Sequence, residues 1–380
     1  MKDGVILYIG GFELPDKNAA AHRVLSNAKI FRELGKKVVF IGVDRTLSWN
    51  SNVLTTRMEV QGFDAYSLPY PKGSKSWLKY LTDIKDYVEI CEKLGNVEMM
   101  ILYNFQAIAM KRLMGYCKKK GIKCCADVTE WRSAKGEGVV YRILKDSDTW
   151  YRMHVLHKRL DGLIVISRYL ENYYKDCKNV AYIPVLVDCS EKKWENNYEK
   201  SSDVLKLVYA GNPGRKDRLD KLIEGLDKVK KKYLLDVIGI TKEQYLSYYP
   251  KHTELLKKHT NIVFHGRMPH LETLDYVKRA NYSCFFRDDD RVSKAGFPTK
   301  FVEAISCGTP VLTNRTSSIT EFCENNMDAI IIEKFGCEEI KDGIEASPLL
   351  LSVTTSRFHF EKYIESIQNW INCLGMKGRD

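Results

Sequence analysis

The sequence lacks the long apolar runs of a membrane-spanning protein and the cysteine spacing of a metal site. No window in its 380 residues approaches the roughly 20 apolar residues that a spanning helix needs. A strand-like run starts directly after Gly4, so we expect no signal peptide and a cytoplasmic protein. The eleven cysteines are odd in number and include no C-x-x-C pair, which indicates reduced thiols and no bound metal.

No recognised nucleic-acid-binding motif accompanies the net charge of +11, so we expect no nucleic-acid partner. The charge is unevenly distributed along the chain. Residues 1–190 carry 30 Lys or Arg against 21 Asp or Glu, a net charge of +9, and the remaining residues carry +2. An ordinary solvated surface accounts for this excess, and so does a face that meets an anionic lipid surface or an anionic acceptor.

The length exceeds that of one ordinary core and fits two domains. The first begins with a predicted strand over 5–9, a turn at Gly10 and Gly11, a helix over 19–34 and a strand over 38–43. A right-handed crossover places such strands in parallel in one sheet. The glycine pair lets the backbone approach a ligand at the carboxyl edge of that sheet.

Polar residues after a later strand, residues 124–128, mark a second candidate site in the first half. Asp127 and Glu130 fall where this strand ends, the usual position of a site in a parallel sheet, so they are acceptor-side or catalytic candidates. A capping or structural role is the alternative. Residues 76–95 are predicted as one amphipathic helix, and 141–159 as a cationic, aromatic helix suited either to a membrane surface or to solvent.

The second half repeats the pattern of strand, turn and helix. A predicted strand over 205–210 leads into a turn that opens at Gly211 and contains Arg215 and Lys216. Backbone amides in such a turn can line an anion hollow, and the two basic residues place positive charge beside it. The turn is therefore a candidate phosphate site.

A second candidate phosphate site lies within residues 293–314. A short predicted helix begins at Pro298 and Thr299 after a glycine-containing loop. The unpaired N–H groups at the start of a helix favour an anion, and Lys300 adds a full positive charge. Glu303 lies one turn further along the same side, where a carboxylate suits a pair of ribose hydroxyls.

This stretch resembles the signature of retaining glycosyltransferases of the GT-B fold, the family usually called family 4. The matching segments are Gly296-Phe297-Pro298, Glu303-Ala304 and Cys307-Gly308-Thr309-Pro310-Val311. The resemblance implies an α/β protein with two Rossmann-like, doubly wound domains facing a cleft and a C-terminal helix that crosses back to the first domain. The implied parts are an acceptor-side domain over 1–188, a linker over 189–203, a nucleotide-sugar donor domain over 204–357 and the returning helix over 358–380.

The resemblance also implies an activity: transfer of a hexose or deoxyhexose from a nucleotide-diphosphate donor, with retention of configuration. The donor is a substrate, and no metal or other cofactor is expected. The acceptor would be a saccharide or a lipid-linked molecule in bacterial surface polysaccharide assembly, at the inner face of the cell membrane. The predicted donor-binding residues are Gly10, Gly11, Gly211, Arg215, Lys216, Arg267, Phe297, Pro298, Thr299, Lys300 and Glu303.

One position departs from the signature: the family normally has a first Glu eight residues before the second, and Ala295 stands there. Either the donor sugar lacks the hydroxyl that this Glu would hold, or a neighbouring acid supplies the charge, which makes Asp288, Asp289 and Asp290 catalytic candidates. Two other functions stay open. They are a nucleotide-sugar epimerase of the same fold, whose usual histidine and carboxylate pattern is not evident, and a non-catalytic nucleotide-sugar-binding protein.

Overall fold

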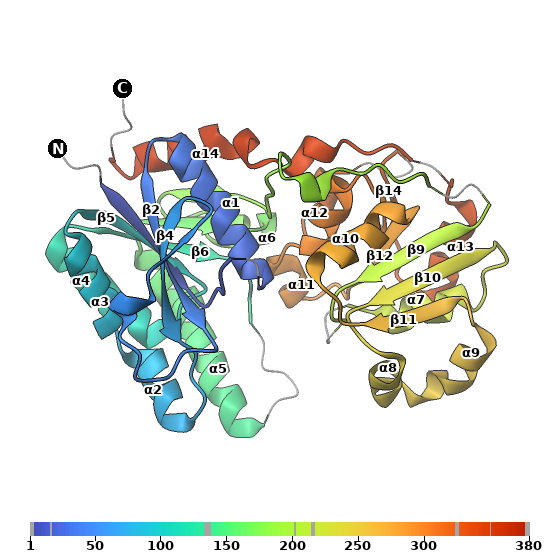
Figure 1. Ribbon diagram of the computed structural model, residues 1–380, viewed down its shortest axis with the longest axis horizontal. Helices are drawn as coiled ribbons and strands as arrows, with labels where there is room; N and C mark the ends of the chain where they lie inside the picture. Colours follow the sequence, from blue (N-terminus) through green and yellow to red (C-terminus); the bar gives the residue numbers. More distant parts are fainter. Residues whose placement is uncertain are drawn as a thin grey trace. The chain divides into compact units, whose positions relative to one another are not determined.

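The computed structural model describes residues 4–15, 17–132, 138–200, 203–213, 217–323, 327–349 and 351–376. The chain forms two compact units, each built on its own sheet (Figure 1). Unit 1 comprises Met1–Leu186 with Phe360–Asp380, and unit 2 comprises Val187–His359. The predicted two-domain α/β fold is confirmed.

The sheet of unit 1 has eight strands in the order β3-β4-β2-β1-β5-β6-β7-β8, parallel except for the antiparallel pair β3 and β4. Its central strands are runs of buried apolar residues, as expected for a parallel sheet covered on both faces. The strands are β1 Val5–Gly10, β2 Lys37–Asp44, β3 Met58–Val60, β4 Phe63–Pro69, β5 Val97–Tyr103, β6 Lys123–Val128, β7 Gly162–Val165 and β8 Val180–Tyr182.

Seven α-helices of unit 1 belong to the described part of the chain: α1 Ala19–Glu33, α2 Ser74–Thr82, α3 Lys85–Leu94, α4 Ala107–Lys120, α5 Val139–Tyr151, α6 Arg168–Tyr173 and α14 Ile364–Cys373. Helix α1 begins where the Asn18 side chain accepts a hydrogen bond from the amide of Ala21 at 2.9 Å. The late helix α14 lies beside α1 (Figure 1) and adds Ile367, Trp370 and Ile371 to the unit 1 core.

The prediction of one helix over 76–95 is wrong. Helix α2 ends at Thr82, because Asp83 is extended and its carboxylate accepts a hydrogen bond from the amide of Lys85 at 3.0 Å. Helix α3 then starts at Lys85, after a break of two residues. Local apolar periodicity could not reveal this break, since both helices keep an apolar side.

The predicted helix over 141–159 also differs from the structure. Helix α5 ends at Tyr151 and is followed by a π-helical turn and a 3-10 turn. Arg152 and His157 are buried rather than presented to solvent, each with 2% of its surface exposed. The segment is therefore not a continuous cationic face; most of α5 faces solvent, and so do Lys158 and Arg159 in the 3-10 turn.

Unit 2 has a six-stranded parallel sheet in the order β11-β10-β9-β12-β13-β14. The strands are β9 Leu205–Ala210, β10 Tyr233–Ile238, β11 Ile262–Gly266, β12 Tyr282–Phe285, β13 Val311–Asn314 and β14 Ala329–Ile332. The described helices are α7 Leu219–Leu226, α8 Lys242–Tyr248, α9 Thr253–Lys258, α10 His270–Arg279, α11 Arg291–Ala295, α12 Thr299–Ser306 and α13 Cys337–Ala346. This strand order reverses between β9 and β12, the point where doubly wound sheets bind ligands.

The stretch predicted as a linker, 189–203, belongs to unit 2 in its described part. Trp194 is buried, and the side-chain amide of Asn196 donates to the carbonyl of Cys307 at 2.7 Å. These contacts tie the stretch to the body of unit 2. Across the described ranges, no helix combines the length and apolar character needed to cross a membrane.

Candidate functional site

The candidate site of unit 2 lies at the carboxyl ends of β9 and β12, where the strand order reverses. The turn after β9 runs through Gly211 towards Asp217, and Arg287 follows β12 directly. Asp217 and Arg287 form an isolated antiparallel bridge that joins these two connections. In open parallel sheets, ligands bind in the crevice outside the carboxyl ends of the strands, so side chains at this edge can reach a ligand.

Asp217 is the centre of a buried ion cluster that sequence reasoning missed. One carboxylate oxygen accepts from Arg287 Nε at 2.8 Å, and the other accepts from the Tyr209 hydroxyl at 2.9 Å and from Lys300 Nζ. The Lys300 ammonium also lies 4.1 Å from the centre of the Tyr209 ring. Two cations therefore share one carboxylate, which leaves the cluster with a net charge of +1.

Burial and charge act in opposite directions on this cluster. Burial by itself would raise the pKa of Asp217, but Lys300 and Arg287 outweigh it and lower the pKa from 3.8 to about 2. Burial lowers the pKa of Lys300, and Asp217 opposes that effect. Asp217 thus stays ionised and helps Lys300 to keep its proton in a largely water-excluded place.

The backbone of the glycine turn comes close to the cluster at Lys300. Gly211 has φ +132°, a conformation that strongly favours glycine, and a Cβ there would lie 3.3 Å from Lys300 Nζ. Gly239, after β10, packs so closely that a Cβ would lie 2.4 Å from the carbonyl oxygen of Gly211. Lys300 therefore meets bare backbone at this turn. The predicted phosphate contacts Arg215 and Lys216 lie outside the described residues.

Helix α12 carries Lys300 in its first turn and Glu303 one turn later, as predicted. No side chain caps the start of this helix. The Glu303 carboxylate accepts a hydrogen bond from His270 Nε2 at 3.0 Å and is 19% exposed. His270 is the first residue of α10, so Glu303 is held between two helices and keeps access to solvent.

The other predicted donor residues of this region divide into two groups. Phe297 and Pro298 are buried, and the Phe297 ring packs against the rings of Phe322 and Phe358 at 5.6 and 6.0 Å, so its side chain serves the core rather than a ligand. Thr299 is half-buried at the start of α12, and Arg267 is exposed after β11. Their part in donor binding stays a prediction.

The acidic run predicted to replace the missing Glu is engaged in local contacts. Asp288 accepts from Arg218 at 2.7 Å and Asp289 pairs with Lys294 at 3.0 Å. Asp290 caps α11 by accepting from the amide of the third residue of that helix at 2.7 Å. The three carboxylates therefore do not converge on one point, which weighs against a shared catalytic role.

In unit 1, Asp127 occupies a structural position rather than a catalytic one. It is fully buried, and its carboxylate accepts from Arg23 Nη2 at 2.7 Å and from the Tyr8 hydroxyl at 2.6 Å. Arg23, itself buried, also donates to the carbonyls of Ile183 and Pro184. This ion pair ties α1, β1, β6 and the chain after β8 together, and it leaves Asp127 no surface for an acceptor.

Glu130 and the glycine pair are placed differently. Glu130 accepts from Arg132 Nε at 2.7 Å and keeps 25% of its side chain exposed, so it remains an acid at the carboxyl edge. A Cβ at Gly10 would lie 2.8 Å from Tyr103, so this glycine is required for packing. A Cβ at Gly11 would lie 3.3 Å from the Tyr80 hydroxyl. Their predicted contact with a donor stays a prediction.

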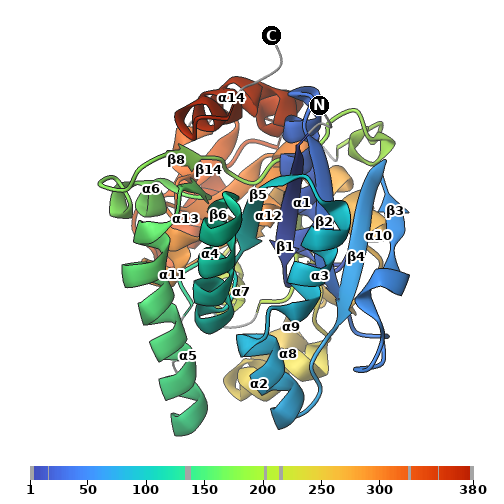
Figure 2. The same cartoon turned by 90° about the vertical axis from the view of Figure 1, so that its left-hand side faces the viewer.

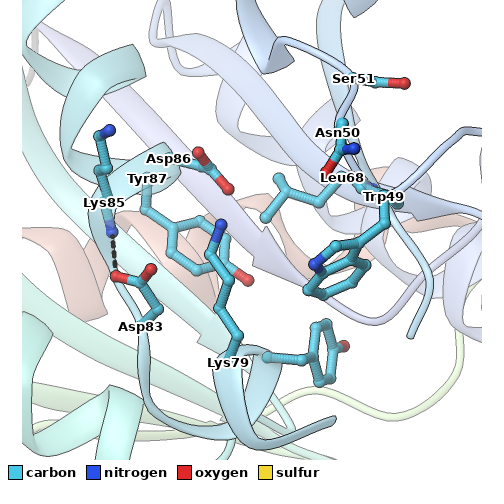
Figure 3. A pocket seen from close by; sticks show the side chains of 11 residues that line it. Trp49, Asn50, Ser51, Leu68, Lys79, Asp83, Lys85, Asp86 and Tyr87 are labelled. Carbon is cyan, nitrogen blue, oxygen red and sulfur yellow. Dashed lines mark hydrogen bonds between the residues drawn. The ribbon is translucent and has the colours of Figure 1, made fainter. Parts of the chain in front are cut away.

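Tyr80 belongs to the wall of a pocket of about 220 Å³ at the end of β4 (Figure 3). Trp49 forms one side of the pocket and Lys79 another, with Lys79 Nζ 5.8 Å from the centre of the Trp49 ring. Asp83 and Asp86 add carboxylates, and burial raises the pKa of Asp86. An aromatic face beside several hydrogen-bonding groups is suited to a sugar ring.

Sequence reasoning found Lys300 and Glu303 but not Asp217, Arg287 or His270. A usable signal existed for Asp217, which follows the predicted strand over 205–210, because polar residues after a strand commonly form sites. Its pairing with Arg287 could not be predicted, since it depends on β9 and β12 being neighbours. Across the described ranges, no group of three or more His, Cys, Asp or Glu residues is arranged to hold a metal ion.

Comparison with protein families gives a match, which covers the candidate site of unit 2. Residues 190–348 match the family Glycosyl transferases group 1. The matched region contains the Asp217 cluster and α12, so the residues that form the candidate site lie inside the stretch that resembles this family. A search of curated protein sequences found no match.

Solved structures resemble the whole chain at low sequence identity. Sucrose-phosphate synthase from Thermosynechococcus elongatus is 13% identical, with 98% of this chain and 96% of that chain covered and a TM-score of 0.66. A glycosyltransferase from Rickettsia africae is 14% identical, with 98% and 96% covered and a TM-score of 0.65. Anabaena HepE in complex with UDP and glucose is 12% identical, with 97% and 99% covered and a TM-score of 0.63. These likenesses confirm the GT-B fold.

Proposed function

We propose that this protein is a retaining glycosyltransferase that moves a hexose or deoxyhexose from a nucleotide-diphosphate donor to an acceptor. The observation that carries the proposal is the cluster of Lys300, Arg287 and Asp217 beside the glycine turn at Gly211. The cluster has a net positive charge at the strand-order reversal, within the residues that match Glycosyl transferases group 1. Retention is proposed from the family resemblance.

The cluster suits the hardest part of such a transfer, the departure of the diphosphate. When the anomeric bond breaks, negative charge builds up on the leaving group while the sugar becomes positively charged. Fixed cations in a water-excluded place stabilise that charge without reorganising. Lys300 would contact the diphosphate, and Arg287 would hold Asp217 in place. Arg215 and Lys216 would add positive charge to the diphosphate site. The proposal needs no metal ion, because the chain supplies these cations itself.

Glu303 would hold the ribose of the donor. Its carboxylate already has His270 on one oxygen and keeps solvent access, so it can accept from ribose hydroxyls. His270 therefore acts as a positioning residue that sets the direction of the Glu303 carboxylate. Two solved structures of similar fold contain uridine nucleotides, HepE with UDP and glucose and an Escherichia coli protein with UDP-2-fluoro glucose. UDP-sugars are accordingly the first donors to test.

The acceptor would bind to unit 1. The pocket formed by Trp49, Tyr80 and Asp86 has the aromatic and polar lining that sugar rings favour, and Glu130 is an acid at the same edge of the sheet. The finer part of the proposal concerns the acceptor's nature. A lipid-linked saccharide of bacterial surface polysaccharide assembly, met at the inner face of the membrane, fits the basic excess of residues 1–190.

The test is acceptor-dependent release of nucleoside diphosphate. The protein is incubated with UDP-glucose, UDP-galactose and deoxyhexose donors, with and without lipid-linked and free saccharide acceptors. Release that requires the acceptor, with a product of unchanged anomeric configuration by NMR, supports the proposal. Conversion of the donor to its epimer would assign the epimerase function. Tight donor binding without turnover on any acceptor would assign a binding protein. Either of these two outcomes overturns the proposal.

A further inference from the structure

The exposed apolar side chains of this protein gather on one part of unit 1. Fourteen large apolar side chains are exposed among the residues that the structure describes, and nine of these lie on α2, α4 and α5. The nine are Trp77, Leu78, Leu81, Ile108, Val139, Tyr141, Ile143, Leu144 and Trp150. Single exposed apolar residues are common on protein surfaces, but a concentration of this size calls for a partner.

The three helices form one continuous surface, because α4 lies between α2 and α5 and contacts both. Arg112 of α4 donates to the carbonyl of Thr82 at the end of α2. On the other side, Asp148 of α5 accepts from the amide of Ala107, the first residue of α4, at 2.7 Å. The apolar residues of α2 and α5 therefore flank the beginning of α4.

The contact at Asp148 also shows that α5 projects beyond the neighbouring helix. Nine residues of α5 precede Asp148, and at 1.5 Å per residue they extend about 13 Å past the start of α4. Figure 2 shows α5 reaching farther than α4. Tyr141, Ile143 and Leu144 on this projecting part are 53 to 65% exposed. Apolar residues this close in sequence point to several sides of a helix. This arrangement is typical of a helix that is buried against other protein or lipid.

The charge of the same surface indicates what covers it. Helix α2 carries Lys75 and Lys79 and no Asp or Glu, and the projecting part of α5 carries Arg142 and Lys145 beside Asp146. On α2, Lys75 and Lys79 are exposed beside the apolar Trp77 and Leu78. Basic side chains among exposed Trp and Leu residues match a bilayer surface, where the apolar groups enter the boundary of the acyl chains and the cations meet anionic head groups.

We propose that α2, α4 and α5 of unit 1 dock this protein on an anionic bilayer, with the first turns of α5 and the outer side of α2 inserted among the head groups. The docking is not electrostatic alone, since the exposed apolar side chains enter the lipid. Helix α2 also carries Lys79 and Tyr80 of the pocket described above. If the proposed function holds, docking would bring that pocket close to the head groups, where the saccharide of a lipid-linked acceptor lies.

The experiment measures vesicle binding of the full-length protein without nucleotide or acceptor, so its result is independent of transferase activity. Flotation with phosphatidylcholine vesicles, with and without one-third phosphatidylglycerol, is compared for wild type and Leu78→Gln/Leu144→Gln. Glutamine keeps helix propensity and removes the apolar group. We expect wild type to bind anionic vesicles with a blue shift of Trp fluorescence. The double variant should bind about tenfold more weakly or worse, because two leucines no longer leave water.

Leu271→Gln is the matched control, because Leu271 is 61% exposed on α10 of unit 2. Its vesicle binding should equal that of wild type, and all variants should melt alike. Absence of vesicle binding overturns the proposal. Equal binding by wild type and the double variant, with complete loss in high salt, also overturns it, since only charge would then be involved. A wild-type dimer that the double variant dissociates would assign the surface to a second copy of the chain and likewise refute bilayer docking.

Discussion

Asp217→Asn should weaken the fold and tighten anion binding at the same time. The substitution keeps the size of the side chain, but its one oxygen replaces only the carboxylate oxygen that accepts from Arg287, and its NH2 group then faces the Tyr209 hydroxyl, which can accept from it. It removes the one negative charge between two cations, so the net charge of the cluster rises from +1 to +2. A variant that improves binding while it costs stability is difficult to explain unless the cluster is an anion site.

The stability cost follows from the pKa of Asp217. A shift from 3.8 to about 2 corresponds to about 2.5 kcal/mol of folding free energy. Because the folded-state pKa is lowered, this stabilisation is complete above pH 4 or so and is lost as the pH falls towards about 2. The unbalanced cations add to the loss, so Asp217→Asn should lower the free energy of unfolding by about 3 to 5 kcal/mol near neutral pH. Urea denaturation measures it.

The gain in anion affinity can also be bounded. Removing a unit charge at roughly 6 Å from a bound phosphate, with an effective dielectric constant of roughly 20 to 60, changes the interaction by about 1 to 3 kcal/mol. Pyrophosphate and UDP should therefore bind about five- to a hundredfold more tightly by calorimetry at pH 6.5. The gain should shrink at higher pH, because Asp217 no longer opposes the effect of burial on the pKa of Lys300.

Asp328→Asn provides the control, since Asp328 is a mostly buried carboxylate of unit 2 that pairs with Arg357. It should cost stability without any gain in pyrophosphate affinity. If Asp217→Asn weakens pyrophosphate binding while the protein stays folded, the cluster is not the anion site. Equal gains in both variants would show a general effect of net charge and refute the reasoning in the same way.

Three further outcomes are expected. Lys300→Ala should lower turnover about thirty- to a thousandfold, or about 2 to 4 kcal/mol, in the nucleotide-release assay, while Arg287 still balances Asp217 and the protein melts cooperatively. Trp49→Ala should raise the acceptor KM several-fold with donor binding by calorimetry unchanged. Burial holds the pKa of His157 well below its usual 6.5, so unfolding free energy should fall by up to about 1.4 kcal/mol per pH unit below pH 6.5, and His157→Gln should flatten that slope in urea titrations.

The sequence was sufficient for features that depend on neighbours in the chain. The strand, turn and helix around Gly211, and the placing of Lys300 and Glu303 on one short helix, follow from local patterns. The sequence did not reveal which residues distant in the chain are brought into contact by the sheet. Asp217 and Lys300 are 83 positions apart, and nothing in either neighbourhood indicates that their side chains meet.

Local patterns also gave misleading candidates. Three consecutive carboxylates at Asp288, Asp289 and Asp290 suggested shared chemistry, yet the chain directs each to a different partner. Asp127 stands at a strand end, which favoured a site, but the buried Arg23 of α1 reaches it through the core. A residue's place along a strand is readable from sequence, whereas its burial depends on what packs over the strand end.

The packing of α14 on unit 1 has a consequence for biosynthesis. Trp370 donates to the carbonyl of Asn179 at 2.7 Å, and Gly162 has no room for a Cβ, which would lie 2.9 Å from the Trp370 ring. Residues 360–376 thus complete a core whose strands and other helices are translated first, while unit 2 is one uninterrupted segment. On the ribosome, unit 2 can fold as one continuous segment, but the earlier-made unit 1 keeps the part of its core that α14 covers exposed until residue 376 is made. A nascent chain arrested before residue 360 should therefore bind chaperones through its N-terminal half.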